Sequence, residues 1–474
     1  MAKIKKNKYT GIFRGGGKSA IRRFRERRKK LMKKENKLMV ITGVPYGPGQ
    51  ETVWSYAYTP TYQEPAIMYL TGINQSAVIL LLDPDSTESD EILFVNPKDH
   101  DKEFWDGVRF GVGDEKSARE ARTVTGIKDI RSIKDFQKVL RERFFKRKQK
   151  RLGALWIEGI KKGKKTAIKT DHNWNFKKKL MGMLGKWKAP GKALSNIMTS
   201  HFDLRLPLDE YDVAHTLKAQ RITGQAFEET LRNFHQFKNE IQVQGFIEGQ
   251  MIMRSPYGLS FPSIVASGHN ATILHYVKND DDFDKSELVL IDFGARWMTM
   301  HADISRTIPV SGKFNPLQKL LYEIVLKAQL IVEKRAKMGV RIKELNELCW
   351  NSINHELVKT FKSAGGKYKL KYERRPHGVS HLIGEQEHDG DPFRNYTDEP
   401  MKAGWMISNE PGVYGRFQLK HKGKTYDEEI GIRIEDNLLI TKKGCQNLSR
   451  GIPKTVQAIE SLMCAANRNR GRVL

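Results

Sequence analysis

The sequence has few cysteines and no long apolar run. Its 474 residues contain Cys349, Cys445 and Cys464, which are widely spaced and odd in number. This content excludes a disulfide-stabilised scaffold, matches no zinc-finger spacing and suits a reducing cytosol. The longest clear apolar run, residues 77–82, is far too short to cross a bilayer, and the charged N-terminus lacks the apolar stretch of a secretory signal. We therefore expect a cytoplasmic protein without a membrane span.

Acidic residues are scarce relative to basic ones. The chain has 83 Lys and Arg against 55 Asp and Glu, which gives a net charge of +28. Half of this excess lies in a basic N-terminal arm, residues 1–37, and a further basic tract covers residues 141–151. Such an arm could make non-specific contacts with nucleic acid or with an anionic membrane surface. Because no recognition module accompanies it, a solvated basic surface is the preferred interpretation.

The first half of the chain predicts an α/β domain. Short apolar segments bounded by Asn, Asp, Ser and Gly indicate strands, and apolar residues at helical spacing indicate helices. The expected helices cover residues 20–37, 101–105 and 133–145. The expected strands cover residues 38–42, 68–71, 77–82, 91–94 and 155–157. This order of segments favours a single sheet flanked by helices.

The second half predicts an α+β domain. Pro207 interrupts the chain within residues 204–208, so we expect an N-terminal domain over residues 1–203 and a second domain over residues 204–474. Helices are expected at residues 209–229, 241–253, 314–336 and 342–361, and strands at residues 288–310 and between residues 405 and 441. Helices followed by hairpins, without strict alternation, are typical of the α+β class.

Two carboxylates mark the hairpin expected at residues 288–310. An apolar run ends on Asp292, Gly294 allows a bend, and Asp303 follows eleven positions after Asp292. A carboxylate at the end of a buried strand is costly unless positive charge faces it, and two such carboxylates could share a divalent cation. They could equally be strand-end residues that meet solvent or arginine. The hairpin alone does not decide between these alternatives.

Three later segments supply more side chains of the kinds that bind metal ions. They are PHGVSHLIGEQEHDG, SNEPGVYG and GIRIEDNLLIT, which contain His377, His381, His388, Glu410, Arg433 and Glu435. Taken singly, each residue has a structural explanation, as a hydrogen-bonded histidine, a turn glutamate or an ordinary surface ion pair. Their joint order along the chain is what favours a metal site.

This order resembles the ligand order of the metallopeptidase family that contains methionine aminopeptidase, aminopeptidase P, prolidase and creatinase. The matching residues are Asp292, Asp303, His381, Glu410 and Glu435. The flanking segments LVLIDFGA, ADISRTIPVSGKF, HGVSHLIG and NEPGVY are similar as well, and YLTGINQSAVILLLDP in the first half resembles aminopeptidase P. The resemblance implies a creatinase/prolidase-like N-terminal α/β domain followed by a pita-bread catalytic domain.

The five ligands imply a centre of two divalent cations. Four carboxylates supply a charge of −4, which two such ions balance. Oxygen-rich ligation with one imidazole and no thiolate favours Mn²⁺, with Co²⁺, Fe²⁺ and Zn²⁺ as alternatives. By resemblance, Asp303 and Glu435 would bridge both ions. Asp292 would hold one ion, and His381 with Glu410 would hold the other.

The resemblance also implies catalytic roles. Glu410 would take the proton from the attacking water. His275, His377 and His388 would bind the scissile carbonyl and the prolyl side of the substrate, and would carry a proton to the leaving nitrogen. Arg433 would support the site and meet either the substrate carboxylate or a neighbouring ligand.

The expected activity is that of a Xaa-Pro aminopeptidase, which releases the N-terminal residue from peptides with proline in second position. The catalytic half follows residues 1–203, an arrangement similar to that of aminopeptidase P and prolidase, and it implies a homodimer or homotetramer. Two alternatives stay open. One is a prolidase, which cleaves only Xaa-Pro dipeptides, and the other is a non-catalytic binding protein with the same fold.

Overall fold

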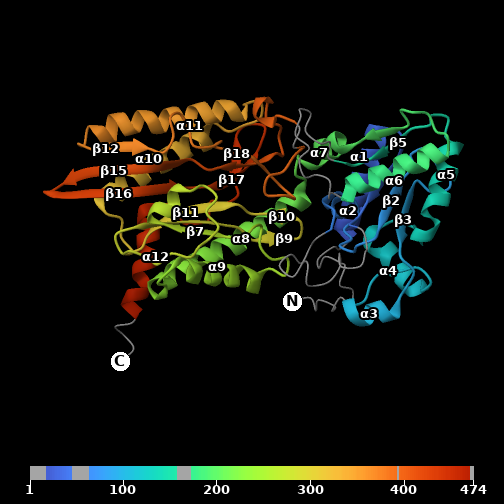
Figure 1. Ribbon diagram of the computed structural model, residues 1–474, viewed down its shortest axis with the longest axis horizontal. Coiled ribbons are helices and arrows are strands. Elements are labelled where there is room, and N and C mark those ends of the chain that lie inside the picture. The colour runs from blue at the N-terminus through green and yellow to red at the C-terminus, as the bar shows by residue number, and fades with distance from the viewer. Residues whose placement is uncertain (1–17, 45–62, 157–171, 392–393, 470–474) are drawn as a thin grey trace. The chain divides into compact units, whose positions relative to one another are not determined.

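The computed structural model describes residues 18–44, 63–156, 172–391 and 394–469 (Figure 1). The chain forms two compact units. The first comprises residues 1–205 together with 390–394, and the second comprises residues 206–389 and 395–474. Residues 1–17 of the basic arm lie outside the described part of the chain. Among the described residues, no helix is long and apolar enough to span a membrane.

The first unit contains a six-stranded mixed sheet of order β4-β3-β2-β1-β5-β6. The central strands β1, β2 and β3 are antiparallel neighbours, whereas β4, β5 and β6 add in parallel pairings. The strands are β1 (Leu38–Thr42), β2 (Ile79–Leu82), β3 (Glu91–Val95), β4 (Asp129–Ser132), β5 (Leu152–Ala154) and β6 (Leu194–Asn196). The helices are α1 (Lys18–Glu35), α2 (Pro65–Thr71), α3 (His100–Asp106), α4 (Glu115–Thr125), α5 (Phe136–Lys146), α6 (His172–Lys186) and α7 (Met198–Arg205).

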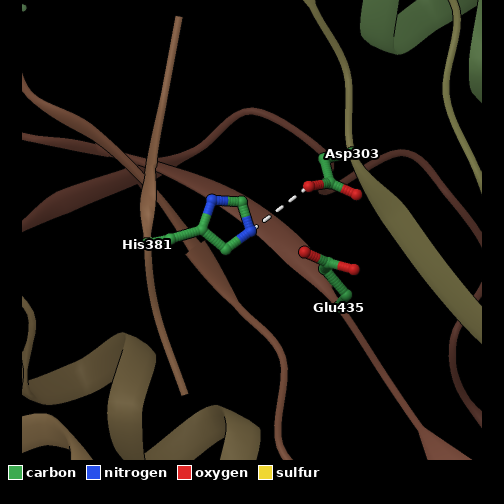
Figure 2. Close-up of side chains that lie close together, drawn as sticks. All are labelled: Asp303, His381 and Glu435. Carbon is green, nitrogen blue, oxygen red and sulfur yellow. Dashed lines mark ion pairs between the residues drawn. The ribbon is translucent and has the colours of Figure 1, made fainter. Parts of the chain in front are cut away.

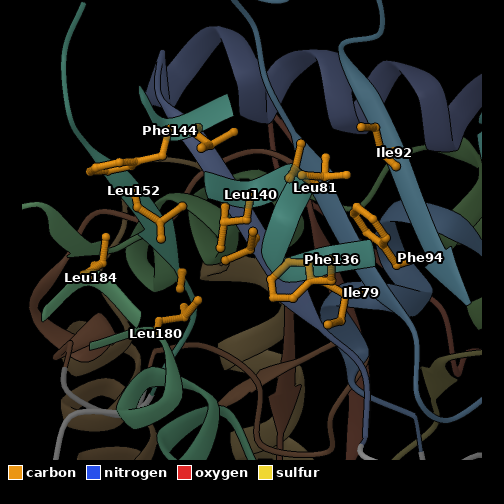
Figure 3. Close-up of a cluster of buried hydrophobic side chains, with 14 of the residues drawn as sticks. Ile79, Leu81, Ile92, Phe94, Phe136, Leu140, Phe144, Leu152, Leu180 and Leu184 are labelled. Carbon is orange, nitrogen blue, oxygen red and sulfur yellow. The ribbon is translucent and has the colours of Figure 1, made fainter. Parts of the chain in front are cut away.

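The core of the first unit lies between the sheet and helices α5 and α6. Leu81 and Phe94 from the sheet pack with Phe136 and Leu140 of α5 and with Leu180 of α6 (Figure 3). All five side chains are buried, and the Phe94 and Phe136 rings meet edge to face at 5.4 Å. Burial of apolar surface on this scale is what stabilises the unit, at about 25 cal/mol per Å².

Two strand predictions in the first unit are wrong. Residues 68–71 belong to helix α2, because Glu64 accepts a hydrogen bond from the Ala66 backbone amide, Pro65 opens the helix, and Gly72 closes it in the left-handed conformation (φ 72°). These end signals outweigh the strand propensity of the short segment. Of the strand expected at residues 155–157, Leu155 and Trp156 follow β5 (Leu152–Ala154), which pairs with β1 and β6, and residue 157 lies outside the described residues.

The second unit combines helices with several antiparallel sheets. Figure 1 shows α10 and α11 on one side of its strands and α8 and α9 on the other. The helices are α8 (Glu210–Asn233), α9 (Glu240–Arg254), α10 (Pro316–Arg335), α11 (Ile342–Glu356) and α12 (Val456–Asn469). The strands are β7 (Ile264–Ser267), β8 (Leu288–Phe293), β9 (Arg296–Trp297), β10 (Met300–His301), β11 (Ile304–Pro309), β12 (Lys367–Leu370), β13 (Leu382–Ile383), β14 (Met406–Asn409), β15 (Gly412–His421), β16 (Lys424–Arg433), β17 (Asp436–Ile440) and β18 (Cys445–Asn447).

Strands β8 and β11 pair in an antiparallel register that places Asp292 opposite Ser305. The connection folds back through the short β9–β10 hairpin, with Met298 in the left-handed conformation (φ 58°). Gly294 lies where this connection is tightest, because a Cβ atom there would lie 1.8 Å from the Ala302 carbonyl oxygen. A backbone atom cannot move aside as a flexible side chain can, so the close approach requires glycine.

We therefore expect Gly294→Ala to destabilise the protein by roughly 1–3 kcal/mol, the usual cost of overpacking. Gly249→Ala is the matched control, because that residue lies in α9 and a Cβ atom there meets nothing within 4 Å. The control should be neutral or should stabilise the helix by up to about 1 kcal/mol. Thermal unfolding of both variants measures the difference. Equal stability of the two variants would contradict the assignment.

Candidate metal centre

One cavity of about 350 Å³ in the second unit collects every site residue expected from the sequence. Asp292 is the last residue but one of β8, Asp303 precedes β11, His381 precedes β13, Glu410 follows β14, and Glu435 lies between β16 and β17. The cavity is also lined by the remaining expected residues, His275, His377, His388 and Arg433. Residues 160 positions apart along the chain, such as His275 and Glu435, therefore meet because the antiparallel strands end at one place.

Three of these side chains form the tightest group. Asp303, His381 and Glu435 each offer one ligand atom, and these atoms lie within 4.8 Å of one another (Figure 2). His381 Nε2 is 3.4 Å from Asp303 Oδ2 and 3.4 Å from Glu410 Oε1. The Nε2 atom of the imidazole therefore faces the carboxylates of Asp303 and Glu410 at the same time.

The tautomer of His381 suits a metal ligand. Its Nδ1 lies 3.1 Å from the Leu382 carbonyl oxygen, which can only accept a hydrogen bond, so Nδ1 carries the proton in the neutral ring. The lone pair is then on Nε2, the atom that faces Asp303 and Glu410. A second hydrogen bond of this kind is what usually orients a histidine that binds metal.

Arg433 and Ser305 hold the carboxylates of Asp292 and Glu435 in place by hydrogen bonds. Arg433 Nη2 donates to Asp292 Oδ2 at 2.6 Å, and its Nε donates to Ser305 Oγ at 2.8 Å. Ser305 Oγ in turn donates to Glu435 Oε2 at 2.8 Å. Each of the two carboxylates thus has one oxygen held in place by a donor on the protein side.

The other oxygens of these carboxylates have no such partner. Asp292 Oδ1 and Glu435 Oε1 are buried, and neither has a hydrogen-bond donor among the described residues. A buried carboxylate oxygen without a partner costs several kcal/mol. Two such oxygens on one cavity, beside Asp303 and His381, form a donor set that fits divalent cations with oxygen ligands.

The electrostatics of the cavity point the same way. Burial, together with repulsion by Asp303 and Glu410, raises the pKa of Asp292 to about 6 despite the opposing effect of Arg433. The same causes raise the pKa of Glu435 well above its ordinary value. Burial would lower the pKa of His381, but its hydrogen bond to Asp303 and the charge of Glu410 raise it to about 9. The protein side chains alone therefore do not supply enough positive charge for these acids.

Backbone contacts position the ligands further. Asn437 brackets Asp303, because its Oδ1 accepts from the Asp303 amide at 3.0 Å and its Nδ2 donates to the Asp303 carbonyl at 2.7 Å. Ser408 Oγ accepts from the His381 amide at 2.9 Å and donates to Glu410 Oε1 at 3.1 Å. Both Asn437 and Ser408 are fully buried, which restricts the ligands to one arrangement.

Two histidines flank the group as neutral side chains. Burial lowers the pKa of His377, and burial together with the charge of His381 lowers the pKa of His388. His377 Nδ1 donates to the Gly378 carbonyl at 2.8 Å, which leaves its Nε2 to accept from Tyr414 Oη at 3.1 Å. The ring of His388 stacks on that of His381 with centroids 4.0 Å apart.

The sequence-based reasoning missed three residues of the site. Ser305 and Tyr414 link Arg433 to its neighbours through hydrogen bonds, and Glu387 adds a fifth carboxylate to the cavity lining. Burial, together with Asp303 and Asp292, raises the pKa of Glu387 to about 7. Strand alternation could have found Tyr414, which lies two residues after Gly412 on β15. Glu387 lies in an irregular loop after β13, where no periodicity indicates its direction.

Comparison with known proteins matches both halves of the chain. The family model "Metallopeptidase family M24" matches residues 214–442, and "Aminopeptidase P, N-terminal domain" matches residues 24–152. The Xaa-Pro aminopeptidase of Haemophilus influenzae is 30% identical over 85% of this chain and 89% of its own length. The Xaa-Pro aminopeptidase of Escherichia coli is 27% identical over 86% of this chain and 90% of its own length.

The fold is similar to that of solved aminopeptidases. The aminopeptidase PepP of Pseudomonas aeruginosa superposes with a TM-score of 0.77 over 94% of this chain and 99% of its own, at 24% identity. The predicted fold, an N-terminal α/β domain followed by a pita-bread domain, is thereby confirmed.

Divalent cations should stabilise the protein in a pH-dependent way. The raised pKa of Asp292, about 6, favours the metal-free fold at low pH, and this contribution is lost as the pH rises through 6. A cation offsets the repulsion between the ionised acids, so added Mn²⁺ should raise Tm by several degrees at about pH 7.5 and by much less at about pH 5. Thermal unfolding with and without Mn²⁺ measures this difference.

Asp303→Asn is the control variant, because it removes a charge at the centre of the group and keeps the size of the side chain. Most of the rise in Tm that Mn²⁺ produces at about pH 7.5 should be lost in this variant. Two results would contradict the assignment of this cavity as the metal centre. One is a Mn²⁺-dependent rise in Tm of the native protein that does not vary with pH, and the other is a rise that Asp303→Asn retains in full.

Proposed function

The chain belongs to metallopeptidase family M24 and carries the N-terminal domain of aminopeptidase P, and from this premise we propose that it is a metal-dependent Xaa-Pro aminopeptidase. It hydrolyses the first peptide bond of peptides whose second residue is proline. The observation that carries the proposal is the single cavity that joins four carboxylates, His381 and three further histidines. A non-catalytic binding protein would not need a cavity lined by carboxylates that repel one another, two of whose oxygens have no hydrogen-bond donor among the described residues.

The residues that would hold two divalent cations follow from the donor set. Asp292, Asp303, His381, Glu410 and Glu435 would hold the divalent cations. Manganese is the preferred metal, because hard oxygen donors outnumber the single imidazole. Bound divalent cations supply Lewis acidity for the scissile carbonyl and lower the pKa of a nearby water.

The protein's own residues then handle the proton and the substrate. Glu410 takes the proton of the attacking water, with Oε1 held by the Ser408 hydroxyl and Oε2 3.7 Å from His377 Nδ1. His388 and His275 bind the scissile carbonyl, and His377, which lies beside Glu410, helps to carry the proton to the leaving nitrogen. As in any peptide bond, that nitrogen must be protonated to leave as an amine, and the prolyl nitrogen of an Xaa-Pro bond has no N–H of its own. Arg433 keeps Asp292 ionised and in place.

The three free thiols, Cys349, Cys445 and Cys464, support a reducing compartment for this activity. A cytoplasmic location is therefore part of the proposal. Cell fractionation of the tagged protein would test it, and enrichment in an oxidising compartment would contradict it.

A series of peptides of increasing length separates the proposed activity from that of a prolidase. With Mn²⁺ present, the chain should release the first residue from a Xaa-Pro dipeptide, a Xaa-Pro-Xaa tripeptide and longer peptides, and should leave Xaa-Ala analogues largely intact. Asp303→Asn should lose at least about 100-fold in kcat/KM on all of them, because a ligand of the centre is neutralised. Product analysis by mass spectrometry measures the cleavage. Turnover of the dipeptide alone would identify a prolidase instead.

The fifth carboxylate gives a prediction about the first residue of the substrate. Glu387 lines the cavity, is 35% exposed, and lies 3.6 Å from the neutral ring of His388. Above its pKa of about 7, this carboxylate should attract a cationic side chain and repel an anionic one. We expect Lys-Pro and Arg-Pro peptides to exceed Glu-Pro peptides about tenfold in kcat/KM, and Glu387→Gln to remove most of this difference while Met-Pro turnover is kept. If Glu387→Gln keeps the preference for Lys-Pro and Arg-Pro over Glu-Pro peptides, Glu387 is not the cause of that preference.

We further propose that the chain assembles as a homodimer or homotetramer. Phe104 and Trp105 on α3 are 85% and 81% exposed and contact each other edge to face, which is the kind of apolar surface that another subunit covers. Light scattering should give a multiple of the 54.5 kDa chain mass, and a Phe104→Ala, Trp105→Ala variant should shift toward the single chain. A native protein that is monomeric at micromolar concentration would contradict the proposal.

A further inference from the structure

The excess positive charge of the chain is confined almost entirely to its first unit. Residues 1–205 contain 45 Lys and Arg against 22 Asp and Glu, a net charge of +23 out of the total of +28. The rest of the chain, with the metal centre, carries a net charge of only +5. Attraction of a peptide substrate to the catalytic unit does not explain this asymmetry, because the charge lies on the other unit.

Part of this charge gathers around two aromatic side chains at the C-terminal ends of α5 and α6. The rings of Phe145 and Trp187 lie 6.4 Å apart, and both neighbour the buried Phe144, which packs in the core of the unit (Figure 3). Phe145 remains 44% exposed. The Phe145 ring thus contacts the core residue Phe144 and is partly exposed to solvent. A flat group can stack on such an exposed ring.

Two cations lie beside the Phe145 ring, and further basic residues follow nearby along the chain. The guanidinium of Arg141 lies 6.0 Å from the Phe145 ring centre, and the ammonium of Lys150 lies 5.7 Å from it. Lys188 directly follows Trp187 and is exposed. Arg151 and Lys192 are neighbours, because the Leu152 amide donates to the Ala193 carbonyl at 2.7 Å, and both are exposed. We call this surface the basic–aromatic strip, and it consists of Arg141, Phe145, Lys148, Lys150, Arg151, Trp187, Lys188 and Lys192.

Structural roles account for some cations of this region, including Lys150 of the strip, whose ammonium donates to the Phe145 and Arg147 carbonyl oxygens. Arg143 and Arg147 pair with Asp83, and Lys146 and Lys186 lie in the last turns of their helices, where they complement the helix dipoles. The exposed members Lys148, Arg151, Lys188 and Lys192 lie beyond the helix ends and have no acidic partner within 4 Å among the described residues. Glu142 is the one acid on α5 near the strip. The strip therefore carries uncompensated positive charge.

We propose that the basic–aromatic strip binds single-stranded RNA without sequence specificity. Cations beside an exposed aromatic ring match a polynucleotide strand, which offers phosphates for ion pairing and flat bases for stacking. An anionic membrane would instead favour a helix with a broad apolar face beneath the cations. The exposed apolar group of this strip is a single ring, Phe145, so stacking of a base fits the surface better than insertion into lipid.

The test uses the full-length protein, a fluorescein-labelled oligouridylate of about 20 nucleotides, and fluorescence anisotropy between roughly 50 and 200 mM salt. Binding should weaken steeply as salt rises. The variant Arg151→Glu with Lys188→Glu should bind at least about tenfold more weakly, with a salt slope reduced by about 1.4 because two phosphate contacts are lost. Phe145→Ala should bind about fivefold or more weakly with an unchanged slope, because it removes stacking and no charge.

The matched control is Lys442→Glu with Lys443→Glu, which makes the same change in charge at two exposed residues of the second unit. This control should bind RNA as the native protein does. Peptidase activity on a Xaa-Pro peptide should be unchanged in all three variants and shows that each is folded. Equal loss in the control pair and the strip pair, or native affinity in the strip pair, would overturn the proposal. Binding to phosphatidylserine vesicles but not to the oligouridylate would overturn it in favour of a membrane.

Discussion

Mutual repulsion of buried carboxylates is the constraint on which the catalytic unit depends. Asp292, Asp303, Glu410 and Glu435 share one cavity, in which His381 is the imidazole that faces them most closely, and two of their oxygens have no donor among the described residues. Burial and repulsion raise the pKa of Asp292 and Glu435, so the group is poorly satisfied by protein atoms alone. When these acids are ionised, divalent cations would supply the missing positive charge.

The antiparallel strands of the second unit hold this unfavourable arrangement in place. Gly294 lets the β8–β11 connection fold tightly enough to bring the two aspartates together, and Asn437 fixes the Asp303 backbone from β17. Arg433 holds Oδ2 of Asp292, and Ser305 holds Oε2 of Glu435, so that the other oxygen of each carboxylate faces the cavity. The rigidity of these strands, and not the ligands themselves, prevents the acids from turning away toward solvent.

That these residues lie together could be predicted from the sequence, because they occur in distinctive segments whose order along the chain resembles that of a known family. The hairpin register and the orientation of the carboxylates could not, because they depend on contacts such as Asn437 with Asp303, which are 134 positions apart. Residues 68–71 were expected as a strand because their composition outweighed the end signals at Glu64 and Gly72. The basic tract at residues 141–151 can be seen in the sequence, but its contact with Trp187 cannot, because Trp187 follows α6 and meets Phe145 of α5 only in the folded unit.

The metal content of the purified protein tests the central claim most directly. After incubation with Mn²⁺ and removal of the free ion, mass-spectrometric elemental analysis should find two manganese ions per chain, and Asp303→Asn should retain fewer. Two ions would show that the repelling carboxylates exist to bind a dinuclear centre. Fewer than one ion per chain in the native protein, together with no peptidase activity when Mn²⁺ is in excess, would contradict the account.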